Sequence, residues 1–126
     1  MVNGIVAGRL AFVTGAGSGI GRAACQVLSR EGATVIAADK HYESAIQTIK
    51  TYTALARSTL VSHHYELDVS DSKSVQSALS QVLKQYRSPP NIVVNSAGIT
   101  RDNWLLKLSE ADYDSVLDVN LKVRFI

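Results

Sequence analysis

The sequence predicts an α/β fold in which a doubly wound parallel sheet carries helices on both faces. Short apolar runs, typical of strands buried on both faces, alternate along the chain with longer amphipathic stretches of helical spacing. A glycine-rich turn joins the first apolar run to the first helical stretch, and the later runs lead into Asp or Asn. Because helices connect parallel strands by right-handed crossovers, the expected strand order is 3-2-1-4.

The first strand is expected over Leu10–Thr14, where an apolar run leads into the glycines. The first helix should start near Gly19 and end at Glu31-Gly32, because a glycine suits the left-handed conformation that follows a helix. Its apolar pattern consists of Ile20, Ala24, Val27 and Leu28. Cys25 falls off this pattern and has no His and acid partners nearby in sequence, so we interpret it as structural rather than nucleophilic.

The middle of the chain continues this alternation. A second buried strand over Thr34–Ala38 should precede a more polar helix from about Tyr42 to Arg57, and Leu60–Leu67 should form the third strand. Ser70 is expected to cap the next helix, and Pro89-Pro90 should end it. The apolar stripe of that helix comprises Val75, Leu79, Val82, Leu83 and Tyr86.

The last elements are a fourth strand and a helix. The strand is expected over Asn91–Asn95, and Ser109 with Asp112 resembles a capping box that opens the helix. The stripe of this helix that should face the sheet comprises Tyr113, Val116, Leu117 and Leu121. In the preceding loop, we expect packing onto the fold, rather than a substrate pocket, from Trp104, Leu105 and Leu106.

The composition bounds the class of protein. A chain of 126 residues, 46% of them apolar, makes one globular domain at most. The net charge of +2 and the lack of a basic run argue against a nucleic-acid partner. No apolar stretch approaches the ~20 residues of a membrane span, so no membrane partner is expected. One cysteine and no visible targeting signal favour a reducing, intracellular compartment.

The turn Thr14–Gly21 stands between a strand and a helix, where a glycine-rich loop can hold a pyrophosphate. Glycine permits positive φ angles and a close backbone approach, and a helix N-terminus adds unpaired N–H groups and partial positive charge. The candidate contacts are Gly15, Gly17, Ser18, Gly19, Ile20 and Gly21. An ordinary tight turn is the weaker alternative, because the elements stand in the right order for a dinucleotide site.

Asp39 ends the second strand, about twenty residues after the glycine loop. A carboxylate there can accept hydrogen bonds from both hydroxyls of an adenosine ribose, and it would repel a 2′-phosphate. The expected cofactor is therefore NAD, with NADP less favoured. Lys40 could soften the rejection of phosphate, whereas Ser18 adds no cation to the loop. A solvated turn Asp is the alternative interpretation.

Polar and small residues also follow the third and fourth strands. Asp68 and Val69 would reach the adenine edge, although an Asp alone also suits a position beside a helix cap. After the fourth strand, small Ala97 and Gly98 would let the cofactor lie against the backbone, while Asn95 bonds the loop. A simple turn is the competing interpretation of this segment.

Asn120 is a polar residue on the apolar stripe expected for the last helix. A buried amide without partners costs about 1–3 kcal/mol, so Asn120 should be hydrogen-bonded. It is either a satisfied core residue or an active-site Asn that faces the cofactor cleft. No metal is expected at His63-His64, because adjacent strand side chains point to opposite faces and no further ligand has suitable spacing.

These motifs together resemble the short-chain dehydrogenase/reductase family over Arg9 to about Lys122. The residues that carry the resemblance are Thr14–Gly21, Asp39, Asp68, Asn95–Gly98 and Asn120. The resemblance implies a Rossmann-type fold truncated after its fourth strand and the following helix, with residues 1–126 as the N-terminal, dinucleotide-binding part of one domain. The most similar branch contains the 3-oxoacyl-[acyl-carrier-protein] reductases and the type 8 17β-hydroxysteroid dehydrogenases. Asn95-Ser96 departs from the Asn-Asn pair common in the family.

The resemblance implies an NAD-dependent oxidoreductase that acts on a ketone or secondary alcohol, either a 3-oxoacyl thioester or a steroid. In this family, catalysis uses an Asn, which Asn120 matches, together with a Ser and a Tyr that Lys follows four residues later. None of the five Tyr residues here has a Lys at that spacing, so this chain alone is expected to be inactive. The alternative is a non-catalytic, dinucleotide-binding fragment or isoform, and an epimerase-like enzyme is a weaker third possibility.

The resemblance also carries expectations about assembly and location. A full-length form should be a homo- or hetero-tetramer, in the cytoplasm or the mitochondrial matrix. Without strands beside the fourth, Ile92–Val94 should form an exposed apolar edge that is prone to aggregation.

Overall fold

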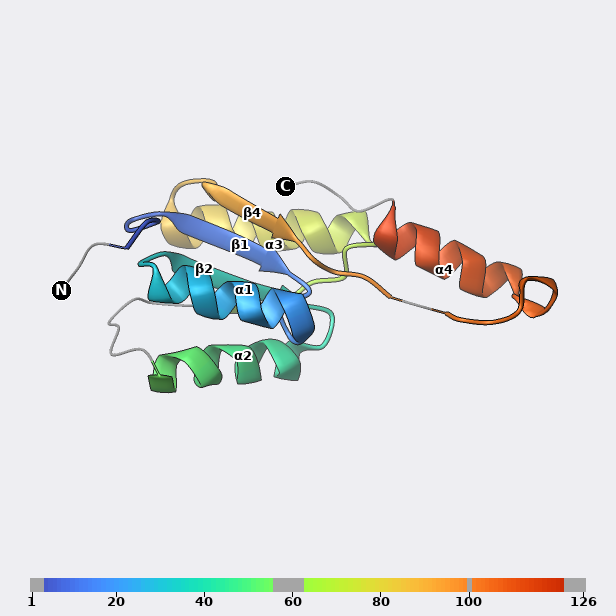
Figure 1. The fold of residues 1–126 in the computed structure, drawn as a ribbon. Coiled ribbons are helices and arrows are strands. Elements are labelled where there is room, and N and C mark those ends of the chain that lie inside the picture. Colours follow the sequence, from blue (N-terminus) through green and yellow to red (C-terminus); the bar gives the residue numbers. More distant parts are fainter. Residues whose placement is uncertain (1–3, 56–62, 100, 122–126) are drawn as a thin grey trace.

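The fold centres on one parallel sheet with the strand order β3-β2-β1-β4, as the sequence predicts. The computed structural model describes residues 4–55, 63–99 and 101–121. The strands within these ranges are β1 (Leu10–Thr14), β2 (Thr34–Asp39), β3 (His63–Glu66) and β4 (Ile92–Asn95). β1 pairs in parallel with both β2 and β4, so it lies in the middle of the sheet (Figure 1).

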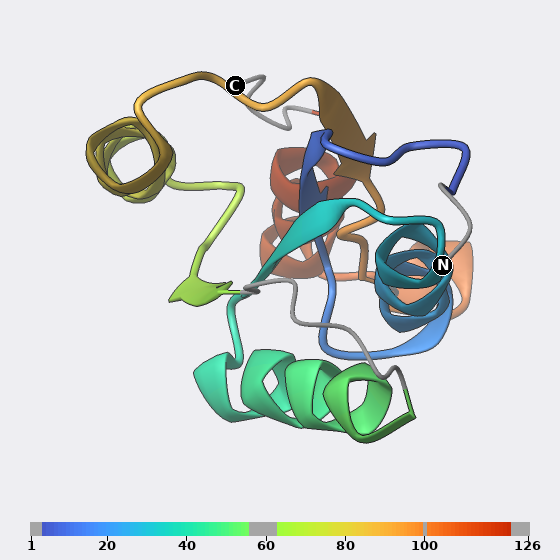
Figure 2. The same ribbon diagram turned by 90° about the vertical axis from the view of Figure 1, so that its left-hand side faces the viewer.

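Helices cover both faces of this sheet. They are α1 (Gly19–Arg30), α2 (Tyr42–Leu55), α3 (Ser72–Tyr86) and α4 (Glu110–Asn120), with a short 3-10 turn, η1, over Leu105–Lys107. Figure 2 shows α1 and α2 on one side of the sheet and α3 on the other. α4 continues beyond the end of the sheet at which β1 and β4 terminate (Figure 1). Within the described helices, none is long and apolar enough to cross a membrane.

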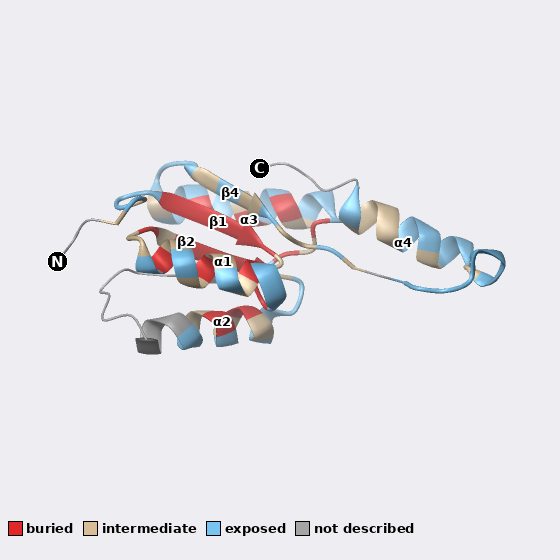
Figure 3. Cartoon of the chain, viewed as in Figure 1, coloured by how far each residue is buried: buried red, intermediate tan, exposed pale blue. Residues whose placement is uncertain are grey.

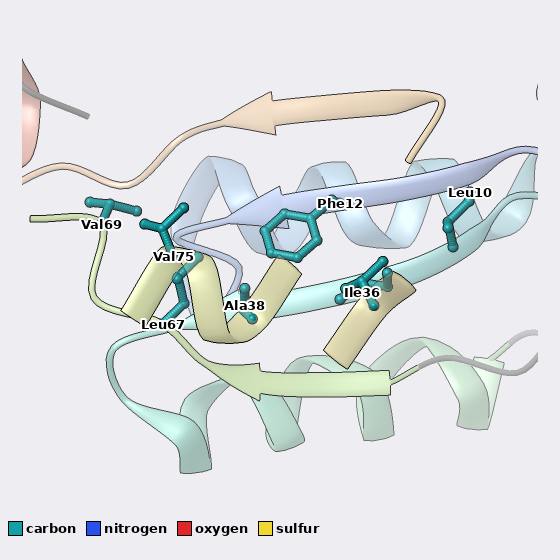
Figure 4. Packing of buried hydrophobic residues seen from close by; sticks show 9 residues of the cluster. Leu10, Phe12, Ile36, Ala38, Leu67, Val69 and Val75 are labelled. Carbon is teal, nitrogen blue, oxygen red and sulfur yellow. The ribbon is translucent and has the colours of Figure 1, made fainter. Parts of the chain in front are cut away.

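The core divides into two clusters because side chains along a strand alternate between faces. In β1, Leu10 and Phe12 point toward α3, whereas Ala11 and Val13 point toward α1 and α2. Figure 4 shows the first cluster, where Phe12 lies among side chains of β2 and α3. All five residues of β1 are buried, which confirms a strand covered on both faces (Figure 3).

The buried face of α1 differs in part from the predicted one: Ala24 and Leu28 pack against the core, as predicted, but Ile20 and Val27 do not. The helix buries Gly21, Cys25 and Ser29, whereas Ile20 is 81% exposed and Val27 is also exposed. Small side chains let the helix backbone lie close to the sheet, and this packing outweighs the larger apolar residues. Cys25 is therefore on the buried face, contrary to the prediction, and burial raises the pKa of its thiol to about 12. A buried, protonated thiol agrees with the structural role expected for it.

The start and the buried stripe of α3, and the end of β3, also differ from prediction. α3 is capped by Asp71 rather than Ser70, because the Asp71 carboxylate accepts a hydrogen bond from the Lys73 N–H at 2.9 Å. Ala78 replaces the exposed Leu83 in the stripe that α3 buries. β3 ends at Glu66, before the buried Leu67. The predicted strand residues 60–62 and helix residues 56–57 lie outside the described ranges.

Among the described residues from Ile92 to Leu121, none is fully buried (Figure 3). β4 is an edge strand of the described sheet, and Val93 on it is 39% exposed. Ser109 caps α4, as predicted, by accepting a hydrogen bond from the Asp112 N–H at 3.0 Å. α4 nevertheless has no buried residue, so its predicted sheet-facing stripe is wrong. The packing expected of the preceding loop is also wrong, since the exposed fractions are 79%, 85% and 98% for Trp104, Leu105 and Leu106.

Candidate functional site

A cleft of about 670 Å³ lies where the strands end and their loops begin. Such a position, at the carboxyl ends of parallel strands where the strand order reverses, is where α/β folds bind ligands. The residues predicted from sequence that line it are Gly15, Ser18, Gly19, Ile20, Gly21, Asp39, Lys40, Asp68, Val69, Ala97 and Gly98. Those that do not line it are Gly17, Asn95 and Asn120. Residues far apart in sequence thus meet in one place.

The glycine loop requires its glycines for two reasons. Gly15 and Gly19 have φ angles of 63° and 55°, in the left-handed region that other residues rarely adopt. A Cβ on Gly15 would lie 2.7 Å from the Ala97 backbone N, and one on Gly21 would overlap the Gly15 carbonyl oxygen. The backbone of α1 at Gly21 and the glycine loop at Gly15 therefore approach their neighbours more closely than a side chain permits.

The N-terminus of α1 opens into this cleft without a side-chain cap. Ser18 occupies the cap position but makes no side-chain hydrogen bond there, and the first turn holds no acidic residue. α3 and α4 are both capped by side chains, from Asp71 and Ser109. The first N–H groups of a helix need a partner and carry partial positive charge, so this end of the cleft suits an anion.

The Asp39 carboxylate is fixed by two backbone donors. Its Oδ2 accepts a hydrogen bond from the Gly17 N–H at 2.8 Å, and its Oδ1 accepts one from the His41 N–H at 2.8 Å. Gly17 thus contributes by holding Asp39 rather than by lining the cleft. Each carboxylate oxygen can accept more than one hydrogen bond, so Asp39 keeps acceptor capacity on its cleft side.

Asp68 lies across the cleft from the glycine loop. Its Oδ1 accepts hydrogen bonds from the Ser70 hydroxyl at 2.6 Å and the Ser70 N–H at 3.0 Å, and its Oδ2 lies 3.9 Å from Lys40 Nζ. The Ser70 hydroxyl is the main reason that the pKa of Asp68 is lowered, with partial burial opposing it. Val69 lines the cleft but also packs into the core cluster beneath it.

Ser96, rather than Asn95, makes the hydrogen bond that holds the loop after β4. The Ser96 hydroxyl donates to the Thr14 carbonyl at 2.6 Å, so it ties the loop after β4 to the start of the glycine loop. Asn95 is exposed and outside the cleft. In the sequence, Ser96 stood out only as a departure from a family pattern. No local pattern predicts its hydrogen bond to a residue 82 positions away.

Asn120 binds the backbone of Ile99 through both ends of its amide. Its Oδ1 accepts from the Ile99 N–H at 2.9 Å, and its Nδ2 donates to the Ile99 carbonyl at 2.9 Å. The expectation that this amide is hydrogen-bonded is confirmed, but Asn120 is exposed rather than buried on the sheet. In this arrangement its side chain fixes the segment that follows Ala97 and Gly98 at the rim of the cleft.

Further residues complete the lining without a sequence signal. His41 lies beside Asp39, and Arg101, Ser115 and Asp118 close the side formed by α4 and the preceding loop. Arg101 pairs with Asp112 at 3.8 Å, between Nε and Oδ1. Among the described residues, no group of three or more His, Cys, Asp or Glu side chains could hold a metal ion.

Comparisons with known proteins agree with this arrangement. A family model described as short chain dehydrogenase matches residues 9–126. The chain is 43% identical over 121 residues to a (3R)-3-hydroxyacyl-CoA dehydrogenase of Canis lupus familiaris, covering 93% of this chain and 47% of that protein. It is 37% identical over 118 residues to the 3-oxoacyl-[acyl-carrier-protein] reductase FabG of Thermotoga maritima, covering 94% and 46%.

The fold has a matching solved structure as well. A short chain dehydrogenase from Mycobacterium avium superposes with a TM-score of 0.83 at 29% identity, over 94% of this chain and 44% of that one. The chain therefore spans about half the length of the relatives it matches.

Proposed function

Because this chain belongs to the short-chain dehydrogenase family, we propose that it forms the NAD-binding part of an oxidoreductase that interconverts a ketone and a secondary alcohol. The observation that carries the proposal is the cleft itself. It joins an uncapped helix start, a loop that excludes side chains and a fixed carboxylate in one 670 Å³ space. These are the features that a pyrophosphate and an adenosine ribose require.

The residues of the cleft suit successive parts of a dinucleotide. The backbone of Ser18 and Gly19 would bind the pyrophosphate at the start of α1. Asp39 would accept hydrogen bonds from the adenosine ribose, and Asp68 with Val69 would meet the adenine. Ala97 and Gly98 would let the remaining half lie against the backbone. When bound, the nicotinamide ring donates or accepts the hydride, while this chain binds and orients it.

The charges around Asp39 favour NAD over NADP. A 2′-phosphate would meet the Asp39 carboxylate, which two backbone N–H groups hold in place. Lys40 follows Asp39 and lines the cleft, so it could neutralise that phosphate, but it pairs with Asp68. Such an exposed pair contributes little, so Lys40 would reduce the preference for NAD without reversing it.

The proposed substrate is a 3-oxoacyl or 3-hydroxyacyl thioester. The names of the two relatives, a 3-hydroxyacyl-CoA dehydrogenase and a 3-oxoacyl-[acyl-carrier-protein] reductase, support this class. The steroid alternative has no such support. Since the chain spans about half of these relatives, the proposal concerns the whole protein of which it forms the cofactor-binding part.

A second candidate function is dinucleotide binding without catalysis by the 126-residue polypeptide itself. It is favoured by one observation, the lack of any Tyr followed four residues later by Lys in this sequence. Asn120 matches the catalytic Asn of the family, but in the family this Asn acts together with the Ser, the Tyr and that Lys.

Isothermal titration of the purified chain with NAD and NADP tests the proposal. NAD should bind at least about tenfold more tightly than NADP. Asp39→Asn should weaken NAD binding and reduce the ratio of the two Kd values. Asp102→Asn is the matched control, because Asp102 is exposed and does not line the cleft. Failure of the chain to bind either nucleotide, or equal binding of both, would contradict the proposal.

A further inference from the structure

Two side chains hold the glycine loop from the side opposite the cleft. Thr48 of α2 is 0% exposed, and its hydroxyl donates to the Ala16 carbonyl at 2.6 Å. Arg22 of α1 donates from Nη2 to the Gly17 carbonyl at 2.5 Å and from Nε to the Thr48 hydroxyl at 3.0 Å. Neither residue lines the cleft. Figure 2 shows the segment between β1 and α1 passing close above α2.

These bonds determine how two peptide groups of the loop are oriented. The peptide between Ala16 and Gly17 is held at its carbonyl by Thr48 and at its N–H by Asp39. The next peptide is held at its carbonyl by Arg22. In a planar trans peptide the N–H points opposite to the C=O, so the Ser18 N–H is directed away from Arg22. Ser18 is the first residue of the loop beyond Gly15 that lines the cleft.

Thr48 links these contacts into one network. Its hydroxyl accepts from Arg22 and donates to Ala16, so it fixes both the guanidinium and the loop. The Ser44 carbonyl, 3.1 Å from the hydroxyl and one helical turn earlier, is a local alternative acceptor. The shorter bond, however, reaches 32 residues back to the loop. The buried Thr48 hydroxyl therefore connects α2, Arg22 and the glycine loop by hydrogen bonds.

We propose that Thr48, acting through Arg22, is a positioning residue for the pyrophosphate of the dinucleotide. The inference rests on the proposed function. If the peptide between Gly17 and Ser18 turned over, its carbonyl, with partial negative charge, would replace the Ser18 N–H at the cleft and repel the phosphates. Thr48 prevents this without touching the ligand, so its loss weakens the binding of phosphate-bearing ligands and leaves the adenosine contacts of Asp39 in place.

The test compares ADP, which carries the pyrophosphate, with adenosine, which lacks it. Thr48→Val replaces the hydroxyl by a methyl group of similar size, and it should weaken ADP binding by about tenfold while the Kd for adenosine stays within about twofold. Thr48→Ser restores the hydroxyl and should recover ADP binding. Thr51→Val is the matched control, because Thr51 lies on the same helix, is exposed and bonds locally to Gln47.

Arg22→Lys is a second variant that keeps the charge but cannot donate to Gly17 and Thr48 in the same geometry. It should also weaken the binding of ADP more than that of adenosine. If Thr48→Val does not fold, Arg22→Lys tests the positioning role instead. Equal losses for ADP and adenosine, or no loss for ADP, would overturn the positioning role. Wild-type chain that binds neither ligand would instead overturn the proposed function.

Discussion

At the scale of single residues, the glycine loop combines two kinds of constraint. Gly15 and Gly21 are required by close contacts with atoms from other segments, whereas Gly19 faces open space and is required only by its φ angle of 55°. The sequence predicted this loop and Asp39, because both belong to a local strand–turn–helix pattern. It could not predict Ser96, Thr48 or Arg22 as partners of the loop, since their hydrogen bonds depend on which elements become neighbours in the folded chain.

Gly21→Ala should therefore be severely disruptive, because the new Cβ would overlap the Gly15 carbonyl oxygen and lie 2.6 Å from Ser96 Oγ. We expect a loss of about 1–3 kcal/mol in the free energy of unfolding, measured in urea, and loss of nucleotide binding. Gly98→Ala is the control for stability alone, because the nearest atom to its new Cβ would be Asn120 Oδ1 at an ordinary 3.5 Å. Equal stability of the two variants would be evidence against the close approach at Gly21.

The hydrogen bond from the Ser70 hydroxyl to the Asp68 carboxylate should make the free energy of unfolding depend on pH. The pKa of Asp68 is lowered in the folded chain, mainly by the Ser70 hydroxyl and further by the charge of Lys40. The stabilisation is thus complete above the unfolded-state pKa of about 3.9 and is lost as pH falls through the lower folded-state pKa. The free energy of unfolding in urea should be larger for wild type than for Ser70→Ala. This difference should be constant near neutral pH and should shrink below about pH 4.

Ser88→Ala provides the reference for this measurement, because Ser88 is exposed and lies outside the cleft. Its stability difference from wild type should not vary over the same pH range. A Ser70→Ala difference that is equally flat would show that the Ser70 hydroxyl does not act through the charge of Asp68.

At the scale of elements, periodicity predicted where helices and strands occur better than it predicted their buried faces. α1 follows the predicted bounds, yet it buries Gly21, Cys25 and Ser29 because small residues permit close packing against β1 and β2. α4 has the predicted cap, but none of its residues is fully buried, and it is Val119, outside the predicted stripe, that packs against the core. A local pattern specifies an amphipathic helix, whereas the neighbouring element decides which side becomes buried.

β4 offers a test at this scale because adjacent residues on it face opposite ways. Val93 is 39% exposed, whereas Val94 packs against the cluster beneath α1. Lysine on an edge strand opposes edge-to-edge pairing, so Val93→Lys should reduce self-association, measured by light scattering, with little change in stability. Val94→Lys should instead destabilise the fold by about 0.5–3 kcal/mol. Self-association that Val93→Lys leaves unchanged would exclude the β4 edge as its cause.

At the scale of the whole molecule, the strand order explains why dispersed sequence motifs form one site. The order β3-β2-β1-β4 brings the ends of β1, β2 and β4 together, although they are far apart in sequence: the hydrogen bond from Ser96 to the Thr14 carbonyl spans 82 positions. This arrangement was predictable because right-handed crossovers leave few alternatives once the alternation of strands and helices is known. The α4 side of the cleft was not predictable, because Arg101 lies in a loop with no regular pattern and the place of Asp118 depends on where that loop sets α4.

The positions of the described tyrosines, and the raised pKa values of two of them, favour nucleotide binding without catalysis by this chain. No described Tyr lines the cleft, and burial raises the pKa values of Tyr65 and Tyr86, the latter to about 12. Efficient proton transfer near neutral pH needs a pKa close to the working pH, so these shifts go in the wrong direction. We therefore expect the purified 126-residue chain to bind NADH, detected by nicotinamide fluorescence, without oxidising it when acetoacetyl-CoA is added. Ketone-dependent loss of NADH that persists through repeated purification would refute this expectation, and Tyr65→Phe and Tyr86→Phe would then identify the group responsible.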